Sequence, residues 1–296
     1  MQTAFTLPSF AKINWTLRIL GKRQDGFHEL FTVFQAVSLH DTIRFAESDS
    51  LELTCDAPSI PTDERNLIVR AAEGLRGHTG IARGARIHLE KRIPSPGGLG
   101  GGSSNAATAL VGLTRLWDLK LSSSDLHSIA ASLGSDVPFF LEGGTAIGTG
   151  RGELIEPVAD ASEEWMLIVT PNVSVSTRDA FEGLSAPTLT NPELNRILTV
   201  CRSEADFGDI GHSVLKNDFE ASVFAAHPEI GRVKQALIDL GAVNAAMSGS
   251  GASVFAIFDN EETRQTAIKA LDHESTWRKF AVATISRDEY REALEI

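Results

Sequence analysis

The sequence predicts an α+β protein made of two halves that meet near residue 160. Three observations support this prediction. Alternating apolar and polar residues mark strands in both halves, and apolar residues at helical spacing recur between those strands. The sequence pattern changes at 155–165, where a short apolar strand follows a glycine-rich stretch. We therefore expect one domain over 1–160, with mixed structure, and an α+β domain over 161–296.

The first half opens on strands. Residues 10–20 alternate apolar and polar side chains, and 27–39 and 41–48 read as two further strands, joined in antiparallel hairpins after a turn at 21–26. Helical spacing follows at 63–77, with Asp63 placed as the N-cap, and 85–94 predicts another short strand.

The rest of the first half is predicted to be mainly helical. One helix should run from Ser103 to Trp117, and a second over 122–134, between a serine cap and Gly134. Residues 135–153 contain too much glycine and proline for a helix, so we expect a loop followed by a glycine-rich strand.

In the second half, 164–171 is a short apolar strand and helices are expected near 217–226, 229–240 and 261–271. A short glycine loop at 247–255 lies between apparent strands, and 280–286 reads as a last strand. On its own, that glycine loop is better explained as a tight hairpin than as a ligand site.

Composition narrows the class of function. The chain has 296 residues and a formal net charge of -12, which argues against broad binding to nucleic acid or to anionic membranes. Cys55 and Cys201 lie far apart, so we expect two free thiols. No apolar run approaches the length of a membrane span, no leader peptide is evident, and we expect a cytoplasmic protein.

The glycine run at 97–102 is the strongest local signal. Five glycines follow a predicted strand and lead directly into a helix. Such a loop lets a ligand approach the main chain, and the unpaired N–H groups of the helix start attract anions, so the stretch predicts a phosphate cradle. It is neither a Walker motif, since Ser103 stands where lysine belongs, nor a dinucleotide motif. A flexible linker is disfavoured by the flanking strand and patterned helix.

Two charged residues stand out beside this run. Lys12 lies on an otherwise apolar strand next to Asn14, and taken alone it is better explained as a solvent-facing residue. Asp136 follows a helix end and precedes an apolar run; it is either a turn aspartate or a partly buried group tuned for proton transfer. The residues alone leave both readings of Asp136 open.

Three motifs together resemble the GHMP kinase superfamily: PSFAKINWTL near the start, PSPGGLGGGSSNAA near 100 and NAAMSGSGASVFAIF near 250. Within it, DGFHEL and LGSDVPFFLEGGTAIGTGRGE most resemble the branch that phosphorylates the 2-hydroxyl of cytidine-diphosphate methylerythritol, in non-mevalonate isoprenoid biosynthesis. The resemblance implies a two-domain fold with an N-terminal mixed sheet, a C-terminal antiparallel α/β sandwich and the active site in the cleft between them.

The resemblance also implies roles for particular residues. Asp136 would be the base for the acceptor hydroxyl, with Lys12 holding it ionised. ATP, with Mg²⁺ carried on it and no protein metal site expected, would lie against the glycine loop: Pro94, Ser95, Pro96, Gly97, Gly98, Leu99, Gly100, Gly101, Gly102, Ser103 and Ser104. The cytidine-bearing acceptor would be bound by a second set: Asn14, Phe27, His28, Thr177, Phe181, Ser248 and Gly249.

The sequence departs from the family pattern twice. Many relatives carry tyrosine where Phe27 stands, and glycine or alanine where Pro96 stands. Because proline lacks an N–H, phosphate contacts should come mainly from Gly98 to Ser104. Two alternatives remain: another small-molecule GHMP kinase, of homoserine or mevalonate type, or an inactive ligand-binding regulator. A plain nucleotide-binding module would leave Asp136 unexplained. We expect a monomer or a weak homodimer.

Overall fold

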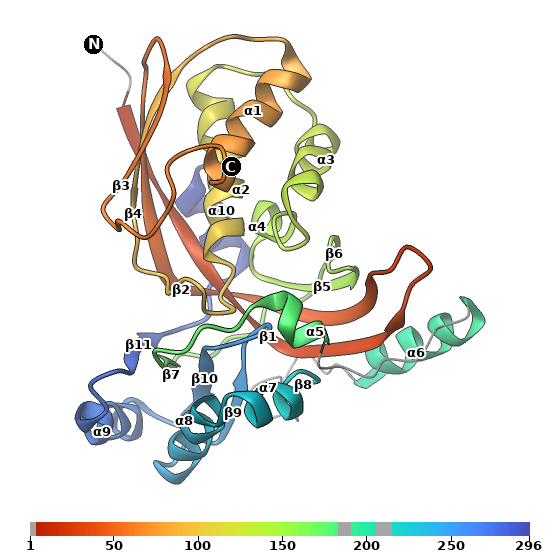
Figure 1. Ribbon diagram of the computed structural model, residues 1–296, viewed down its shortest axis with the longest axis vertical. Helices are drawn as coiled ribbons and strands as arrows, with labels where there is room; N and C mark the ends of the chain where they lie inside the picture. The colour runs from red at the N-terminus through yellow and green to blue at the C-terminus, as the bar shows by residue number, and fades with distance from the viewer. Residues whose placement is uncertain (1–3, 183–190, 205–214) are drawn as a thin grey trace.

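A long β-hairpin forms the spine of the molecule. The computed structural model describes residues 4–182, 191–204 and 215–296. Strands β1 (Ala4–Lys22) and β2 (His28–Ala46) pair antiparallel along almost their whole length and run from the upper to the lower half of the view in Figure 1. The two strands predicted at 27–39 and 41–48 are therefore wrong as separate elements, because β2 continues through both.

The hairpin is the centre of a seven-stranded mixed sheet. Its order is β3 (Leu51–Cys55), β4 (Ala85–Glu90), β2, β1 and β8 (Lys216–Asn217). The first half of β2 also pairs with β5 (Thr145–Gly150), which pairs with β6 (Leu154–Pro157). Pairs β3–β4 and β1–β8 are parallel and the others antiparallel, so the predicted mixed sheet is confirmed.

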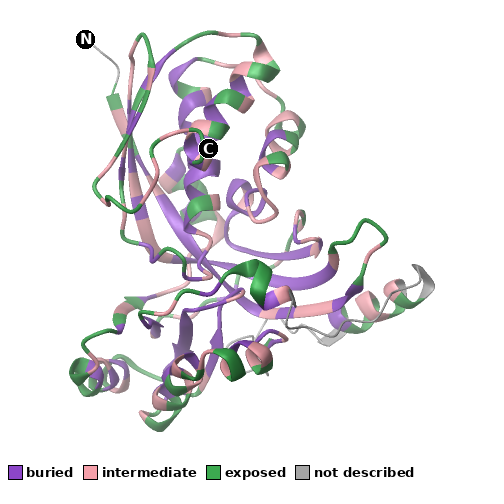
Figure 2. Ribbon diagram, in the orientation of Figure 1, coloured by how far each residue is buried: buried purple, intermediate pink, exposed green. Residues whose placement is uncertain are grey.

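Helices cover one face of this sheet and enclose the first core. They are α1 (Leu67–Thr79), α2 (Gly101–Leu116), α3 (Ser123–Leu133) and the short α4 (Phe139–Glu142), which the sequence analysis missed. Asp63 is not the N-cap of α1. The cap is Asn66, whose side chain accepts from the Ile68 N–H, while Asp63 binds Arg65. Figure 2 shows the inner faces of these helices buried.

The second half is a four-stranded antiparallel sheet between two apolar layers. Its order is β11 (Arg278–Val282), β7 (Met166–Thr170), β10 (Val254–Ile257) and β9 (Asn244–Met247). One face packs on α7 (Glu220–Ala226), α8 (Pro228–Asp239) and α9 (Glu261–Ala270), which is followed by a 3₁₀ turn (Leu271–His273). The other packs on the β1–β2 hairpin, where the Trp15 and Phe255 rings meet edge to face. The predicted antiparallel sandwich is confirmed.

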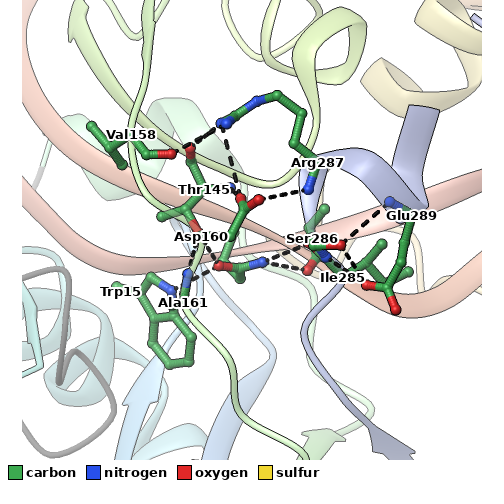
Figure 3. Close-up of polar contacts among 11 residues, drawn as sticks. Trp15, Thr145, Val158, Asp160, Ala161, Ile285, Ser286, Arg287 and Glu289 are labelled. Carbon is green, nitrogen blue, oxygen red and sulfur yellow. Dashed lines mark hydrogen bonds and ion pairs between the residues drawn. The ribbon is translucent and has the colours of Figure 1, made fainter. Parts of the chain in front are cut away.

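The last helix returns to the first half. Helix α10 (Arg287–Leu294) begins at a capping box formed by Ser286 and Glu289. Figure 3 shows the Arg287 guanidinium donating to the carbonyls of Thr145 and Val158, while its backbone N–H donates to Asp160. The sequence analysis predicted no helix here, nor α5 (Thr177–Glu182) and α6 (Asn191–Glu204).

Tyr290, on α10, is buried in the first core, and its hydroxyl donates to the Phe140 carbonyl at 2.8 Å. Burial raises the pKa of this phenol far above its ordinary value. The C-terminal helix is thus an integral part of the core that lies under α2 and α4. Among the described residues, no helix is both long and apolar enough to cross a bilayer.

Candidate active site

A cleft of about 380 Å³ opens where the two halves meet. This volume falls in the range of small-molecule sites. Residues from the hairpin, the glycine loop, the segment before α4, the β5–β6 turn, α5 and the second glycine loop line it. From the residues predicted for the site, the cleft collects Lys12, Asn14, 94–103, Asp136, Thr177, Phe181 and Gly249.

The first glycine loop leads into the N-terminus of α2 inside this cleft. Gly98 and Gly100 adopt left-handed backbone conformations, with φ of 72° and 70°. Gly100 is the N-cap of α2, and no side chain among the described residues caps this helix start. The first N–H groups of a 16-residue helix are therefore available to an anion, and the helix dipole favours one there.

The second glycine loop packs directly against the first. The Ser253 N–H donates to the Gly97 carbonyl at 3.1 Å, and the Ser248 hydroxyl donates to the Gly98 carbonyl at 2.9 Å. A Cβ on Gly98 would overlap the Ser248 carbonyl oxygen. Glycine is therefore required at position 98 both by its φ and by this close approach of two backbones.

Lys12 and Asp136 face each other at the side of the glycine loop. The Lys12 ammonium lies 3.5 Å from the Asp136 carboxylate and donates to the Asn14 side-chain oxygen at 2.7 Å. The same Asn14 oxygen accepts the Gly249 N–H at 2.9 Å, and the Asn14 amide nitrogen donates to the Thr32 hydroxyl. Asn14 thus joins Lys12, strand β2 and the second glycine loop.

Burial sets the electrostatics of this pair. Lys12 is 3% exposed, so the expectation of a solvent-facing lysine, made from its strand alone, is wrong. Burial lowers the pKa of the Lys12 ammonium, and the Asp136 carboxylate opposes that shift. The Asp136 side chain is 34% exposed. A carboxylate in contact with both a buried cation and the open cleft is accessible to a ligand hydroxyl.

Behind the loop, a buried polar network fastens both of its ends. Asp41 is fully buried and forms an ion pair with Lys91. Its carboxylate also accepts the N–H groups of Arg92 and Ile93, at the start of the loop, and the side-chain amide of Asn105, at its end. Both oxygens of the buried Asp41 carboxylate thus have hydrogen-bond partners, which offset the cost of burying the charge.

Phe181 and Phe219 line the other end of the cleft, and further rings lie beside them. The rings of His28 and Phe181 stack with centroids 4.9 Å apart, and Phe181 meets Phe219 edge to face. Burial lowers the pKa of the His28 imidazole, and the charge of Lys22 lowers it further. Phe27 is 53% exposed and lies under the Arg151 guanidinium at 4.9 Å.

Comparison with known proteins decides the family. A model of the GHMP kinases N terminal domain matches residues 66–144, and a model of the GHMP kinases C terminal region matches 193–275. The chain belongs to the GHMP kinases. It is 40% identical, over 90% of its length and 94% of the relative's, to the 4-diphosphocytidyl-2-C-methyl-D-erythritol kinase of Thermodesulfovibrio yellowstonii. It is 42% identical to the kinase of the same name from a Synechococcus strain, with 90% and 89% covered.

Solved structures agree with this placement among the GHMP kinases. A crystal structure of 4-(cytidine 5'-diphospho)-2C-methyl-D-erythritol kinase superposes with a TM-score of 0.75 at 31% identity, covering 95% of this chain and 99% of that one. Homoserine kinase from Cytophaga hutchinsonii superposes with a TM-score of 0.71 at 22% identity, covering 97% and 96%. The second likeness concerns the fold alone.

Two serines predicted for the GHMP kinase site lie behind the cleft. Ser104 is fully buried, and its hydroxyl shares a 2.8 Å hydrogen bond with that of Ser9. Ser248 is also fully buried and uses its hydroxyl to hold the Gly98 carbonyl. Ser103 lines the cleft. In this structure Ser104 and Ser248 therefore shape the loops from behind and present no hydroxyl to a ligand.

The aromatic residues also differ from the expected arrangement. Neither Phe27 nor His28 lines the cleft, and the Phe27 ring contacts the Arg151 guanidinium. Phe181 lies directly on His28, and stacked rings 4.9 Å apart leave no room for a third ring between them. A base entering here must therefore displace one ring or stack on an outer face. Thr177 lines the cleft and shares a hydrogen bond with Ser250.

Several residues of this region were not predicted from the sequence, among them Thr32, Asn217 and Arg151. Thr32 lines the cleft and accepts from Asn14, and the buried Asn217 amide donates to the Met247 and Gly249 carbonyls. No local pattern marked either of them. Arg151 also lines the cleft, and its position inside GTGRGE, between glycines, was a signal that could have found it. The described residues contain no cluster of three or more His, Cys, Asp or Glu side chains arranged to hold a metal.

Proposed function

We propose that this chain transfers the γ-phosphoryl group of ATP to the 2-hydroxyl of 4-diphosphocytidyl-2-C-methyl-D-erythritol, a step of non-mevalonate isoprenoid biosynthesis. The observation that best supports the proposal is the Lys12–Asp136 pair beside the glycine loop. The chain is also 40% identical to a kinase named for this acceptor. The overall negative charge of the protein does not prevent this function, because backbone N–H groups form the phosphate cradle.

In this proposal the phosphates of ATP lie along the loop from Gly98 to Ser103 and against the start of α2. The backbone N–H groups orient the γ-phosphoryl group for in-line transfer. Magnesium, which arrives with ATP, supplies charge neutralisation on the phosphates. The network around Asp41 holds both ends of the loop, so the cradle is rigid before ATP binds.

Asp136 accepts the proton of the acceptor hydroxyl as its oxygen attacks the γ-phosphorus, and ADP leaves. Phosphoryl transfer needs positioning and charge stabilisation more than a strong base, so an aspartate is sufficient. Lys12 is held by Asn14 and contributes a fixed positive charge beside the carboxylate. The second amide hydrogen of Asn14 has no partner among the described residues and can meet the acceptor.

The aromatic end of the cleft distinguishes this function from its rivals. The acceptor of a homoserine or mevalonate kinase carries no base. Here Phe181 lines the cleft and His28 stacks on it, so the pair offers outer ring faces to a cytosine. An inactive regulator of the same fold would have no use for the Lys12–Asp136 pair. We further propose that the parts over 1–160 and 161–296 act as two domains of a cytoplasmic monomer or weak homodimer.

A coupled assay of ADP release with Mg-ATP tests the proposal. The acceptors are the cytidine-diphosphate methylerythritol, the same molecule without cytidine, homoserine and mevalonate. We expect turnover of the cytidine-bearing acceptor alone. Asp136→Asn should lower kcat by about 10²- to 10⁴-fold, the usual contribution of a general base. Turnover of homoserine or mevalonate would contradict the proposed cytidine-bearing acceptor. ATP binding without any turnover would favour the inactive ligand-binding regulator.

A further inference from the structure

The proposed acceptor brings a diphosphate of its own into an acidic protein. The loop N–H groups serve the phosphates of ATP, so a second anionic group in the same cleft needs a second source of positive charge. With a formal net charge of -12, the protein as a whole does not supply it. The inference below rests on the proposed acceptor.

Only two basic side chains, Lys12 and Arg151, line the cleft among the described residues. The segments 1–3, 183–190 and 205–214, which lie outside the description, contain neither lysine nor arginine. Lys12 is buried and already engaged with Asn14 and Asp136. Arg151 is exposed to the cleft and uses only its Nε in an ion pair with Glu153, so it is the cation that remains for a second anion.

Arg151 is held in place with one edge of its guanidinium open. Its Nε forms an ion pair with Glu153 at 3.3 Å, its backbone N–H donates to the same carboxylate at 2.6 Å, and its Cζ lies 4.9 Å from the centre of the Phe27 ring. Neither Nη atom has a hydrogen-bond partner among the described residues, and the side chain is 35% exposed. A guanidinium fixed along Nε presents both Nη donors as a fork for phosphate oxygens.

The register of the sheet puts Arg151 at the right point along the cleft. Gly150 pairs with Leu30 on β2, two residues after His28, whereas Asn14 of the reacting end pairs with Phe34. Four residues of strand separate Leu30 from Phe34, about 13 Å. An acceptor with cytidine at the aromatic end and its hydroxyl at Asp136 carries its diphosphate between the two.

We propose that Arg151 binds the diphosphate of the acceptor through its Nη atoms, with Glu153 and Phe27 orienting the guanidinium. Arg151 is then a residue that selects nucleoside-diphosphate acceptors. Phe27 contributes by supporting the guanidinium from below, a role that a ring without a hydroxyl performs fully.

The test is a comparison of cytidine diphosphate and cytidine as probes. Their affinities are measured by calorimetry on the full chain, with a non-hydrolysable ATP analogue on the glycine loop. The wild type should prefer cytidine diphosphate by about 10-fold or more, as charge-assisted hydrogen bonds provide. Arg151→Met should lose this preference without weakening cytidine, and Arg151→Lys should keep part of it. Arg44→Met, an exposed position on β2, removes the same charge as a matched control.

Three results would overturn the assignment. The wild type could bind cytidine diphosphate no better than cytidine, or Arg151→Met could keep the preference. The variant could also lose affinity for both probes equally, as loss of stacking on the base would produce. In turnover assays, Arg151→Met should raise the KM of the acceptor by about 10-fold or more and leave the KM of ATP unchanged. A wild type that turns over no cytidine-bearing acceptor contradicts the proposed function instead, and the probe comparison still decides the role of Arg151.

Discussion

Lys12 places a charged side chain at a buried position of strand β1, where an apolar residue would be less costly. Its partner Asp136 reaches the open cleft, so Asp136 remains solvated if Lys12 is removed. Lys12→Met should therefore leave the free energy of unfolding unchanged or raise it by about 1 kcal/mol. The same variant should lower kcat by about 100-fold or more, because a fixed charge beside the reacting groups is lost.

Urea denaturation and steady-state kinetics on one preparation measure both effects of Lys12→Met. Lys120→Met, at an exposed position after α2, serves as the control and should change neither. A loss of more than about 2 kcal/mol in Lys12→Met would mean that the ammonium stabilises the fold, contrary to this account.

His28 should make acceptor binding sensitive to pH. Burial and Lys22 lower its pKa, so the imidazole titrates below its unfolded value of about 6.5. Because the folded protein favours the neutral imidazole, His28 stabilises the fold above pH 6.5, and this stabilisation is lost as the pH falls through the folded pKa. We expect the KM of the acceptor to rise as the pH falls below 6.5 and the imidazole becomes protonated, and His28→Asn to flatten that profile. An NMR titration that places the His28 pKa above 6.5 would refute the prediction.

At the level of single residues, the sequence could predict Lys12 and Asp136 because they stand in local motifs. It could not predict how Asn14 is used. The two bonds that fix Asn14 across the fold reach Thr32, 18 residues away, and Gly249, 235 residues away. Contacts at such separations leave no periodicity or spacing for a pattern to detect.

At the scale of the elements, the contact between the two glycine loops shapes the proposed ATP site. Gly98→Ala would force an unfavourable φ and push the Ser248 backbone away. We expect its KM for ATP to rise by about 10-fold or more, since a loop displaced by a fraction of an ångström loses its aligned N–H groups. Gly102→Ala is the matched comparison. Within the described part of the chain, the new methyl group meets only Leu67, at 3.9 Å, and it should stabilise α2 by about 0.5–1 kcal/mol.

Both variants are compared by ATP titration in the kinase assay and by thermal unfolding. Equal KM values for ATP in Gly98→Ala and the wild type would show that contact between the loops does not position the cradle.

The elements that the sequence predicted best are those with long, one-sided apolar patterns, such as α2 and α8. Helix α4 has only four residues, too few to show a period of 3.6. The first turn of α1 was misplaced because Asp63 and Asn66 are both acceptable caps, and the choice depends on packing. Helix α10 has charged residues at most positions, so Tyr290 and Leu294 alone carry its buried face.

At the scale of the whole molecule, α10 fastens the C-terminal end of the chain into the first core. Tyr290→Ala would leave a cavity beside α4 and should lower the free energy of unfolding by about 3–5 kcal/mol. Tyr290→Phe removes only the hydrogen bond to the Phe140 carbonyl and should cost about 1 kcal/mol. Arg291→Ala, at an exposed position one residue later, should be close to neutral.

Denaturant titration ranks these three variants, and hydrogen exchange locates the effect. Tyr290→Ala should speed exchange in α2 and α4 while β7 and β10 keep their protection. Uniform acceleration across both sheets would show that α10 stabilises the molecule as a single unit. The sequence alone could not assign α10 to the first half, because nothing local to 287–294 indicates which core receives it.

The place of α10 also sets an order of events during synthesis. The cradle at 97–102 leaves the ribosome early, but the core beneath it lacks Tyr290 until residues 287–294 have emerged, nearly two hundred residues later. A nascent chain paused between the two halves would therefore carry an incomplete first domain. The first domain is therefore complete only after residues 287–294 have been synthesised, long after its own glycine loop has emerged.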